Sequence, residues 1–306
     1  MQKIKYSYGK KEGNNKYLGN YIIKENITIV LFYNQEMLTE SGVDEPPQTW
    51  EDLITVGEKI IEKYGSGTAI SIVGYNAWDL IHNWAILLRA NGGELLSKDY
   101  SQAVFNNPAG VDAIDYLIGL IDSGLAADEC ISCTQIQAEN DFISGEVAMC
   151  LMGPENITKI EEQGLNYGSI EPPACSNSMI EGTNLVIRAS AAEAEIDAAR
   201  LWIEYLLEKD NLLEYTKEFT LSLPVTEECL NTPYFSGESY NSFKNSLYNA
   251  IPYPSLPEWG EIRNTIEEQL KEILKCYEEE EYDRDRAKEY LDQAADAVND
   301  LLSRNK

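Results

Sequence analysis

Two cysteines three positions apart have the spacing that most directly suggests chemistry in this sequence. Cys130 and Cys133 form a C-x-x-C pair, which occurs in zinc sites and in redox-active dithiols. A structural zinc site needs four ligands, but the other thiols show no paired spacing and the single histidine is His82. A redox motif is usually framed by a βαβ start, which is missing before Cys130. We expect no metal at this pair; a local disulfide and plain free thiols both stay open.

Catalytic groups are the next residues to search for. A single histidine excludes most triads built on Ser-His or Cys-His. The sequence has no G-x-S-x-G motif, no phosphate-cradling glycine-rich loop and no run of metal ligands. A carboxylate pair of the glycosidase kind stays open, because 52 acidic residues supply many pairs, although nothing singles out two of them. We therefore predict that the chain is not an enzyme and that it uses no cofactor.

Size and charge limit the partners. The 306 residues are enough for two packed domains, and the formal net charge of -28 repels nucleic acid and anionic lipid. We expect neither as a partner. No run of eighteen apolar residues is present, and the first residues lack the long apolar region of a secretory signal. Either the chain is cytosolic, or its signal has been removed or lies outside this sequence.

Apolar periodicity predicts strands that alternate with helices. Thr49 is a predicted helix cap and Gly65 a predicted stop, while Trp84, Trp50 and Trp202 are predicted to pack in the interior. Strands are expected at 27–33, 68–73, 147–152 and 185–188, and further helices at 78–90, from Pro108, at 193–208, around 211–219 and twice after Trp259. This alternation indicates an α/β chain.

An ordered set of short motifs resembles a known family. Residues 31–38 (LFYNQEML), 41–44 (SGVD) and 46–53 (PPQTWEDL) are similar to a signature of family 1 extracellular solute-binding proteins, the maltose-binding-protein-like group. The same order continues with residues 91–93 (NGG), 105–111 (FNNPAGV), 142–149 (FISGEVAM), 153–154 (GP), 223–225 (LPV) and 257–259 (PEW). Each motif alone is weak, whereas the ordered set is specific.

The resemblance implies a fold and a division into lobes. The fold would be the α/β periplasmic-binding-protein-like type II, with two discontinuous lobes. Residues 28–181 and 234–306 would form the C-terminal lobe, and residues 1–27 and 182–233 would belong to the N-terminal lobe. Family members carry several βα units before the tyrosine–asparagine signature. Because only residues 1–25 stand in that place, the N-terminal lobe is expected to be incomplete.

The resemblance also implies a function. Proteins of this family close two lobes on a small solute, and the permease subunits of an ABC importer read the closure. Sugar rings lie against aromatic faces, and their hydroxyl groups need polar partners. The candidate ligand-binding residues are Glu25, Asn26, Gly182, Thr183 and Asn184 at the lobe crossings, Tyr75, Asn76, Trp78 and His82 around a helix start, Glu155 after a Gly-Pro pair, and Trp259 and Arg263 at the start of a C-terminal helix.

Alternatives remain for the solute and for the role. Trp78, His82 and Trp259 are also compatible with simple packing, and Glu155 replaces a tryptophan that often follows Gly-Pro in the family. That replacement favours a more polar or cationic solute. A mono- or oligosaccharide is the expected ligand, while a polyol phosphate or a polyamine stays open. We expect an extracellular or cell-surface lipoprotein whose anchor lies outside this sequence. The alternative is a truncated, non-transporting lobe that binds no solute and is either a partner-docking module or a remnant.

Overall fold

The computed structural model describes residues 21–304 except 77–79, 174–177 and 189. Its strands are β1 (Tyr21–Thr28), β2 (Val30–Asn34), β3 (Ile70–Ser71), β4 (Met149–Met152), β5 (Tyr167–Ile170), β6 (Met179–Val186) and β7 (Ile251–Pro252). Its α-helices are α1 (Gln35–Glu40), α2 (Trp50–Tyr64), α3 (Leu80–Ala90), α4 (Pro108–Asp122), α5 (Gln135–Ile143), α6 (Ile157–Gln163), α7 (Glu193–Leu207), α8 (Lys209–Glu214), α9 (Glu227–Leu230), α10 (Asn241–Asn249), α11 (Trp259–Glu278) and α12 (Arg284–Ser303). Short helical turns are η1 (Asp128–Ser132), η2 (Pro154–Asn156), η3 (Tyr215–Phe219) and η4 (Glu238–Tyr240).

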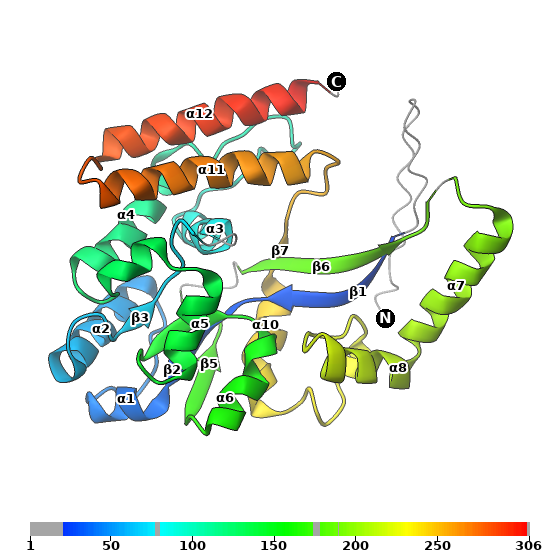
Figure 1. The fold of residues 1–306 in the computed structure, drawn as a ribbon, viewed down its shortest axis with the longest axis horizontal. Helices are drawn as coiled ribbons and strands as arrows, with labels where there is room; N and C mark the ends of the chain where they lie inside the picture. Colours follow the sequence, from blue (N-terminus) through cyan, green and yellow to red (C-terminus); the bar gives the residue numbers. More distant parts are fainter. Residues whose placement is uncertain (1–20, 77–79, 174–177, 189, 305–306) are drawn as a thin grey trace.

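The larger sheet has the order β3-β4-β2-β5 and lies among helices (Figure 1). β2 pairs antiparallel with β4 and β5, and β3 pairs parallel with β4. Phe32 in the central strand is fully buried, and its ring centroid lies 5.7–6.0 Å from those of Phe142, Tyr167 and Phe243. A strand covered on both sides must be apolar throughout, which explains the run VLF at its start.

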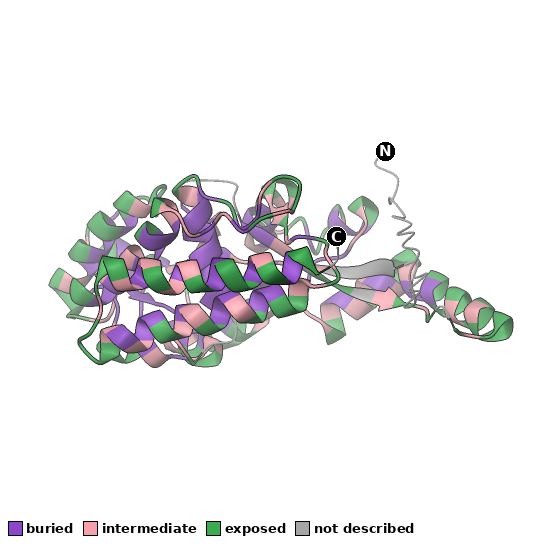
Figure 2. Cartoon of the chain, turned by 90° about the horizontal axis from the view of Figure 1, so that it is seen from above, coloured by how far each residue is buried: buried purple, intermediate pink, exposed green. Residues whose placement is uncertain are grey.

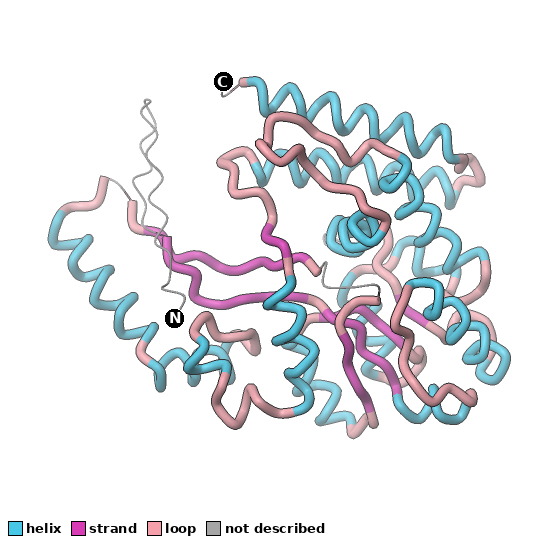
Figure 3. Tube along the Cα trace, turned by 180° about the vertical axis from the view of Figure 1, so that it is seen from behind, coloured by secondary structure: helices cyan, strands magenta, loops and turns pink. Residues whose placement is uncertain are grey.

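The smaller sheet has the order β1-β6-β7, and its long β1–β6 ribbon reaches from the main body towards α7 and α8 (Figures 1 and 3). At its inner end the Thr28 hydroxyl lies 2.7 Å from Ser178 Oγ and 3.0 Å from Ser246 Oγ. All three side chains are buried, and these hydrogen bonds satisfy them. The ribbon is therefore fixed at the point where it joins the main body.

The C-terminal helices α11 and α12 form a pair that covers α3 and α4. Trp84 of α3 is fully buried, as predicted, and donates a hydrogen bond from Nε1 to the carbonyl of Gly110 at 3.0 Å. A Cβ atom at Gly110 would lie 2.1 Å from the Phe105 carbonyl oxygen, so this close approach requires glycine.

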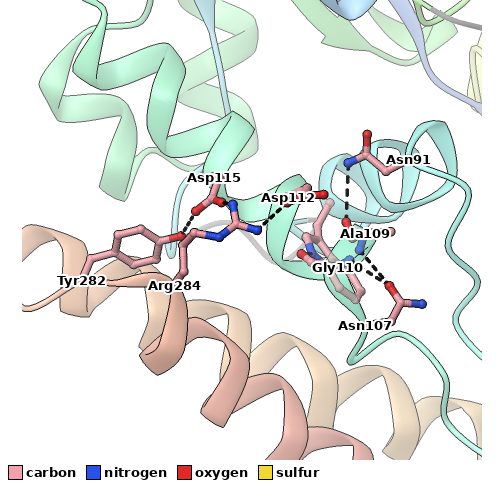
Figure 4. Close-up of polar contacts among 9 residues, drawn as sticks. Asn91, Asn107, Ala109, Gly110, Asp112, Asp115, Tyr282 and Arg284 are labelled. Carbon is pink, nitrogen blue, oxygen red and sulfur yellow. Dashed lines mark hydrogen bonds and ion pairs between the residues drawn. The ribbon is translucent and has the colours of Figure 1, made fainter.

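Polar contacts fasten α12 to α4 (Figure 4). Arg284 lies 2.5 Å from the Asp112 carboxylate and also pairs with Asp115, to which the Tyr282 hydroxyl donates a hydrogen bond. The first turn of α4 is capped by Asn107, whose side-chain oxygen accepts from the amides of Ala109 and Gly110 at 2.9 and 3.3 Å. The helix start predicted at Pro108 is confirmed.

Several sequence predictions are confirmed and others need correction. Thr49 caps α2 in a capping box with Asp52, and Gly65 ends the helix. The strand expected at 27–33 is two strands, β1 and β2, separated at Ile29, and β6 begins at Met179 rather than at residue 185. Among the described residues, none of the helices is both long and apolar enough to cross a membrane.

The predicted burial of Trp202 is wrong. Its side chain is 55% exposed, and its neighbours Leu201 and Tyr205 are 68% and 60% exposed. The reason is that α7 stands at the far end of the molecule and packs against α8 with its other face, where Ile203 and Leu206 are buried (Figure 2). An apolar pattern predicts which face a helix buries only where a second element covers that face.

Candidate ligand-binding site

The β1–β6 ribbon brings together the candidate residues of the two predicted crossings. Asn26 pairs with Gly182, Glu25 with Thr183, and Ile23 with Asn184, with a β-bulge between Ile23 and Glu25. The backbone of Asn26 also exchanges two hydrogen bonds with Leu223, at 2.9 and 3.1 Å. Three segments that are distant in sequence therefore meet at one place, which we call the strand crossing. Gly182 and Thr183 are exposed at this crossing, and Asn26 is half-buried.

A second group of candidates forms what we call the aromatic–basic cluster, defined as His82, Tyr253, Trp259 and Arg263. The Tyr253 hydroxyl lies 3.0 Å from His82 Nδ1, and Arg263 Nη2 lies 3.5 Å from His82 Nε2. The rings of Tyr253 and Trp259 are stacked with centroids 4.9 Å apart and planes 28° apart. Three of these four residues were candidates from sequence. The cluster offers aromatic surface next to hydrogen-bonding groups.

Three elements place these side chains. α3 carries His82, and the first turns of α11 carry Trp259 and Arg263, which share a helix face because they are four positions apart. Tyr253 directly follows β7 and stands between Pro252 and Pro254, which restrict the backbone on either side of it. The helices α3 and α11 pack against each other, so His82 meets the start of α11.

The chemistry of the side chains in the cluster determines which atoms donate and which accept its hydrogen bonds. A guanidinium has donors only, so His82 Nε2 must accept in its contact with Arg263. In a neutral imidazole the proton then sits on Nδ1, which donates to the Tyr253 hydroxyl oxygen. Arg263 is buried with 7% exposure, and Glu267, one helical turn further on, is buried with 4%. Glu267 also pairs with Lys271, whose Nζ lies 3.4 Å from the Glu267 carboxylate.

The cluster lies beside the strand crossing. β6 pairs in parallel with β7, with Ile180 opposite Pro252. Gly182 is two positions beyond Ile180 and Tyr253 one position beyond Pro252, and adjacent strands are about 4.8 Å apart. α3 also contacts β6. The crossing and the aromatic–basic cluster are therefore neighbouring parts of one region.

Other candidates lie elsewhere. Tyr75 donates a hydrogen bond of 2.9 Å to Glu278 at the last turn of α11, whereas Trp259 is at its first turn. A helix of 20 residues is about 30 Å long, so the expectation that Tyr75 faces the same cleft as Trp259 needs correction. The next residue, Asn76, is exposed in a turn, and the predicted contact Trp78 lies outside the described residues.

The position of Tyr75 has a local cause. Its amide donates to the Ile131 carbonyl at 2.9 Å, and the amide of Gly74 donates to the Cys133 carbonyl at 3.0 Å. A Cβ atom at Gly74 would lie 2.2 Å from the Ile131 oxygen, so only glycine lets the chain approach this closely. These bonds draw the segment against η1, which packs on α11.

Glu155 is on η2, after β4, and its carboxylate turns back over Gly153, where a Cβ atom would meet it at 2.2 Å. β4 ends at Met152, which pairs with Val30 at the start of β2. The residue is thus placed on the turn that follows β4, close to the start of β2.

Sequence reasoning missed Tyr253. Its signal was an aromatic residue between two prolines shortly before a predicted helix start, a pattern that rigidly presents one side chain. Its partner His82 is 171 positions away, so no local pattern could have paired the two residues.

The C-x-x-C pair is a pair of buried free thiols in this structure. η1 holds them one 3₁₀ turn apart, and the Cys133 thiol donates a hydrogen bond that lowers the pKa of Cys130. The same bond raises the pKa of Cys133. Within the described part of the chain, no group of three or more His, Cys, Asp or Glu side chains is arranged to hold a metal ion.

Comparison with known proteins places the chain in a family. The model described as "Bacterial extracellular solute-binding protein" matches residues 6–239, which is most of the chain. The chain belongs to this family. Members of the family and the relatives named below are binding proteins.

Two curated relatives of this chain come from Bacillus subtilis strain 168. The galactooligosaccharide-binding protein is 23% identical over 288 residues, which are 89% of this chain and 63% of the relative. The maltodextrin-binding protein is 25% identical over 260 residues, 77% of this chain and 57% of the relative. The chain thus spans about three fifths of the length of these relatives.

Solved structures confirm the predicted fold type. A Thermotoga lettingae solute-binding protein with bound α-D-tagatose has a TM-score of 0.77 at 23% identity, covering 92% of this chain and 72% of that one. The cyclic α-maltosyl-1,6-maltose-binding protein of Arthrobacter globiformis has a TM-score of 0.73 at 22% identity, with the same coverage. The chain therefore has the type II periplasmic-binding fold, with the mixed α/β architecture predicted from sequence.

Proposed function

We propose that the chain is the solute-binding component of an ABC importer and that it binds a carbohydrate at the aromatic–basic cluster. The observation that carries the proposal is the stacked Tyr253–Trp259 pair beside the strand crossing. Stacked rings supply a flat apolar surface for a sugar face, while Arg263, His82 and Tyr253 supply partners for hydroxyl groups. Relatives named for oligosaccharide binding support the same solute class.

The lobe assignment is part of the proposal. Residues 28–181 and 234–306 would form one lobe, and residues 1–27 and 182–233 the other, joined through the β1–β6 ribbon. The ribbon supports this division because its strands leave the main body together and end beside α7 and α8 (Figure 3). Closure about the ribbon would report solute binding to permease subunits. The family description supports an extracellular or cell-surface location.

A thermal-shift screen tests the solute class. A ligand that binds only the folded chain adds about 2.7 kcal/mol at a concentration of 100 Kd. We expect maltotriose or a galactooligosaccharide to raise the melting temperature by several degrees, and spermidine and sorbitol 6-phosphate to leave it unchanged. A higher melting temperature with spermidine alone would indicate a cationic solute instead of a carbohydrate. No rise with any saccharide would remove the proposal.

A second candidate function is a protein-docking lobe without solute binding. The observation in its favour is the exposed apolar face of α7, formed by Leu201, Trp202 and Tyr205. Such a module would show the same melting temperature with every sugar. Its melting temperature would depend instead on protein concentration or on an added partner.

A further inference from the structure

Arg89, in the last turn of α3, is a buried cation with incomplete pairing. Its side chain is 6% exposed, and Nη2 lies 3.3 Å from the carboxylate of Glu94, which is itself 57% exposed. Among the described residues, no hydrogen-bond acceptor reaches Nε or Nη1 of this guanidinium. Burial lowers the pKa of Arg89. A buried charge of this kind destabilises the folded state unless a second acceptor bonds its remaining N–H groups.

A cavity of about 430 Å³ lies against Arg89. Its volume is within the range of ~300–1,000 Å³ that is usual for small-molecule sites. Lys98 adds a second cation to the wall, and Tyr100, which is 44% exposed, lines the cavity together with Pro252 and Pro254. Two cations on one small cavity are notable in a chain with a net charge of -28.

The wall that carries Lys98 and Tyr100 is a fixed turn. Asp99 accepts hydrogen bonds from the hydroxyls of Ser97 and Ser101 at 2.8 and 2.7 Å and from the Ser101 amide at 3.1 Å. Tyr100 has a φ of 56°, in the left-handed region that a tyrosine rarely adopts. A strained residue persists where its surroundings hold it, and strained residues gather at ligand sites.

The cavity adjoins the aromatic–basic cluster. Pro252 and Pro254 flank Tyr253, whose ring contacts His82 and Trp259. Arg89 is seven positions beyond His82 on α3, which is about two turns and ~10 Å along the same helix face. One ligand chain of two or three sugar units can therefore reach from the stacked rings to Arg89.

We propose that this cavity takes the carboxylate of an acidic saccharide, such as a uronic acid unit, with Arg89 as its principal partner and Lys98 as a secondary one. The inference rests on the proposed function and narrows its substrate class. A carboxylate matches the planar donor edge of a guanidinium and accepts two parallel hydrogen bonds from it. In the structure the exposed Glu94 carboxylate contacts only Nη2, whereas a ligand carboxylate in its place also reaches Nη1, which has no acceptor among the described residues.

The direct test compares charge-matched sugars. Calorimetric titration of the full chain uses digalacturonate, the same disaccharide with both carboxylates methyl-esterified, and neutral maltotriose. We expect digalacturonate to bind about tenfold tighter than its ester. Arg89→Gln should remove this preference, so that digalacturonate and its ester bind with equal affinity. Glu94→Gln should strengthen digalacturonate binding, because it removes the competing carboxylate.

Controls separate local from general charge effects. Arg200→Gln alters an exposed arginine on α7, whose side chain is 58% exposed, and should change no affinity. Circular dichroism and the melting temperature show whether Arg89→Gln is folded. Glu94→Gln tests the site independently, because it should strengthen digalacturonate binding where Arg89→Gln weakens it. Equal affinity for acid and ester, with maltotriose bound, would overturn the inference and leave the proposed function intact. Binding of no saccharide at all would overturn both.

Discussion

The Tyr253 hydroxyl and His82 Nδ1 lie 3.0 Å apart, although 171 positions separate the two residues in the sequence. This contact joins the segment after β7 to the helix α3, and Trp259 stacks on the same tyrosine. The candidate site is thus assembled by packing between distant elements, and its properties follow from how these few side chains hold one another.

The tautomer of His82 can be measured by NMR without resonance assignment, because His82 is the only histidine in the chain. Its contact with the donor-only Arg263 places the neutral proton on Nδ1. We expect nitrogen–proton correlation spectra of the neutral ring to show an Nδ1-H tautomer. Arg263→Met should shift the ring towards Nε2-H. An Nε2-H tautomer in the unmodified chain would contradict the assigned hydrogen bonds.

Removing the Tyr253 hydroxyl tests whether the tyrosine positions its neighbours. Tyr253→Phe keeps the ring that stacks on Trp259 and deletes one hydrogen bond, a loss of about 1 kcal/mol. We expect a fivefold to tenfold weaker saccharide affinity, estimated roughly from that energy. Tyr248→Phe is the matched control, since Tyr248 is 63% exposed on α10. Equal effects of both variants in a calorimetric titration would argue against a positioning role.

Truncating Phe32 tests the packing of the hydrophobic core. Its fully buried ring contacts three other aromatic rings, so Phe32→Ala removes apolar contacts and leaves a cavity. We expect a loss of about 3–5 kcal/mol in the free energy of unfolding, measured by urea denaturation. Phe219→Ala is the control, because Phe219 is 74% exposed, and it should cost less than about 0.5 kcal/mol. Similar losses for the two variants would mean that β2 is not central to the core.

Acid should loosen the turn beside Arg89. Hydrogen bonds from Ser101 and Ser97 lower the pKa of Asp99 to about 2. Because this value is below the ordinary value of about 3.9, the stabilising contribution is complete above pH ~4 and is lost as pH falls towards ~2. The carboxyl carbon resonance of Asp99 should titrate with a midpoint near 2. A midpoint near its ordinary value would show that the turn does not hold the carboxylate.

The cysteine pair gives a prediction about a single hydrogen bond. The Cys133 thiol donates to Cys130 and lowers the pKa of Cys130. Cys133→Ala removes the donor and should raise that pKa, whereas Cys133→Ser keeps a donor and should raise it less. The measurement is the pH dependence of thiolate ultraviolet absorbance, taken as a difference against Cys130→Ala. An unchanged titration in Cys133→Ala would show that another group sets the pKa of Cys130.

Local features were predictable from the sequence. The Thr49 cap, the helix start at Pro108 and the burial of Trp84 depend on neighbours within one or two helical turns. Ordered motifs along the chain predicted the family and the fold type. These features depend on interactions between sequence neighbours or on the order of motifs, and both can be seen in a single sequence.

Long-range placement was not predictable. Trp202 has the pattern of a buried residue, yet no described element covers its face of α7. Tyr75 has the right type for a sugar site, yet hydrogen bonds to η1 place it at the opposite end of α11. Tyr253 acquires its role from His82 and Trp259, which come from two other elements. Such outcomes depend on tertiary contacts that residue type and spacing do not encode.

The most direct measurement is a calorimetric titration of maltotriose and a galactooligosaccharide into the unmodified chain, into Trp259→Ala and into Trp202→Ala. Both variants lose a tryptophan, but only Trp259 stacks on Tyr253, while Trp202 is exposed on α7. We predict that the unmodified chain and Trp202→Ala bind saccharide with the same affinity and that Trp259→Ala weakens binding by tenfold or more, a rough estimate from loss of the stacked ring. Undiminished binding by Trp259→Ala would contradict a sugar site at the aromatic–basic cluster.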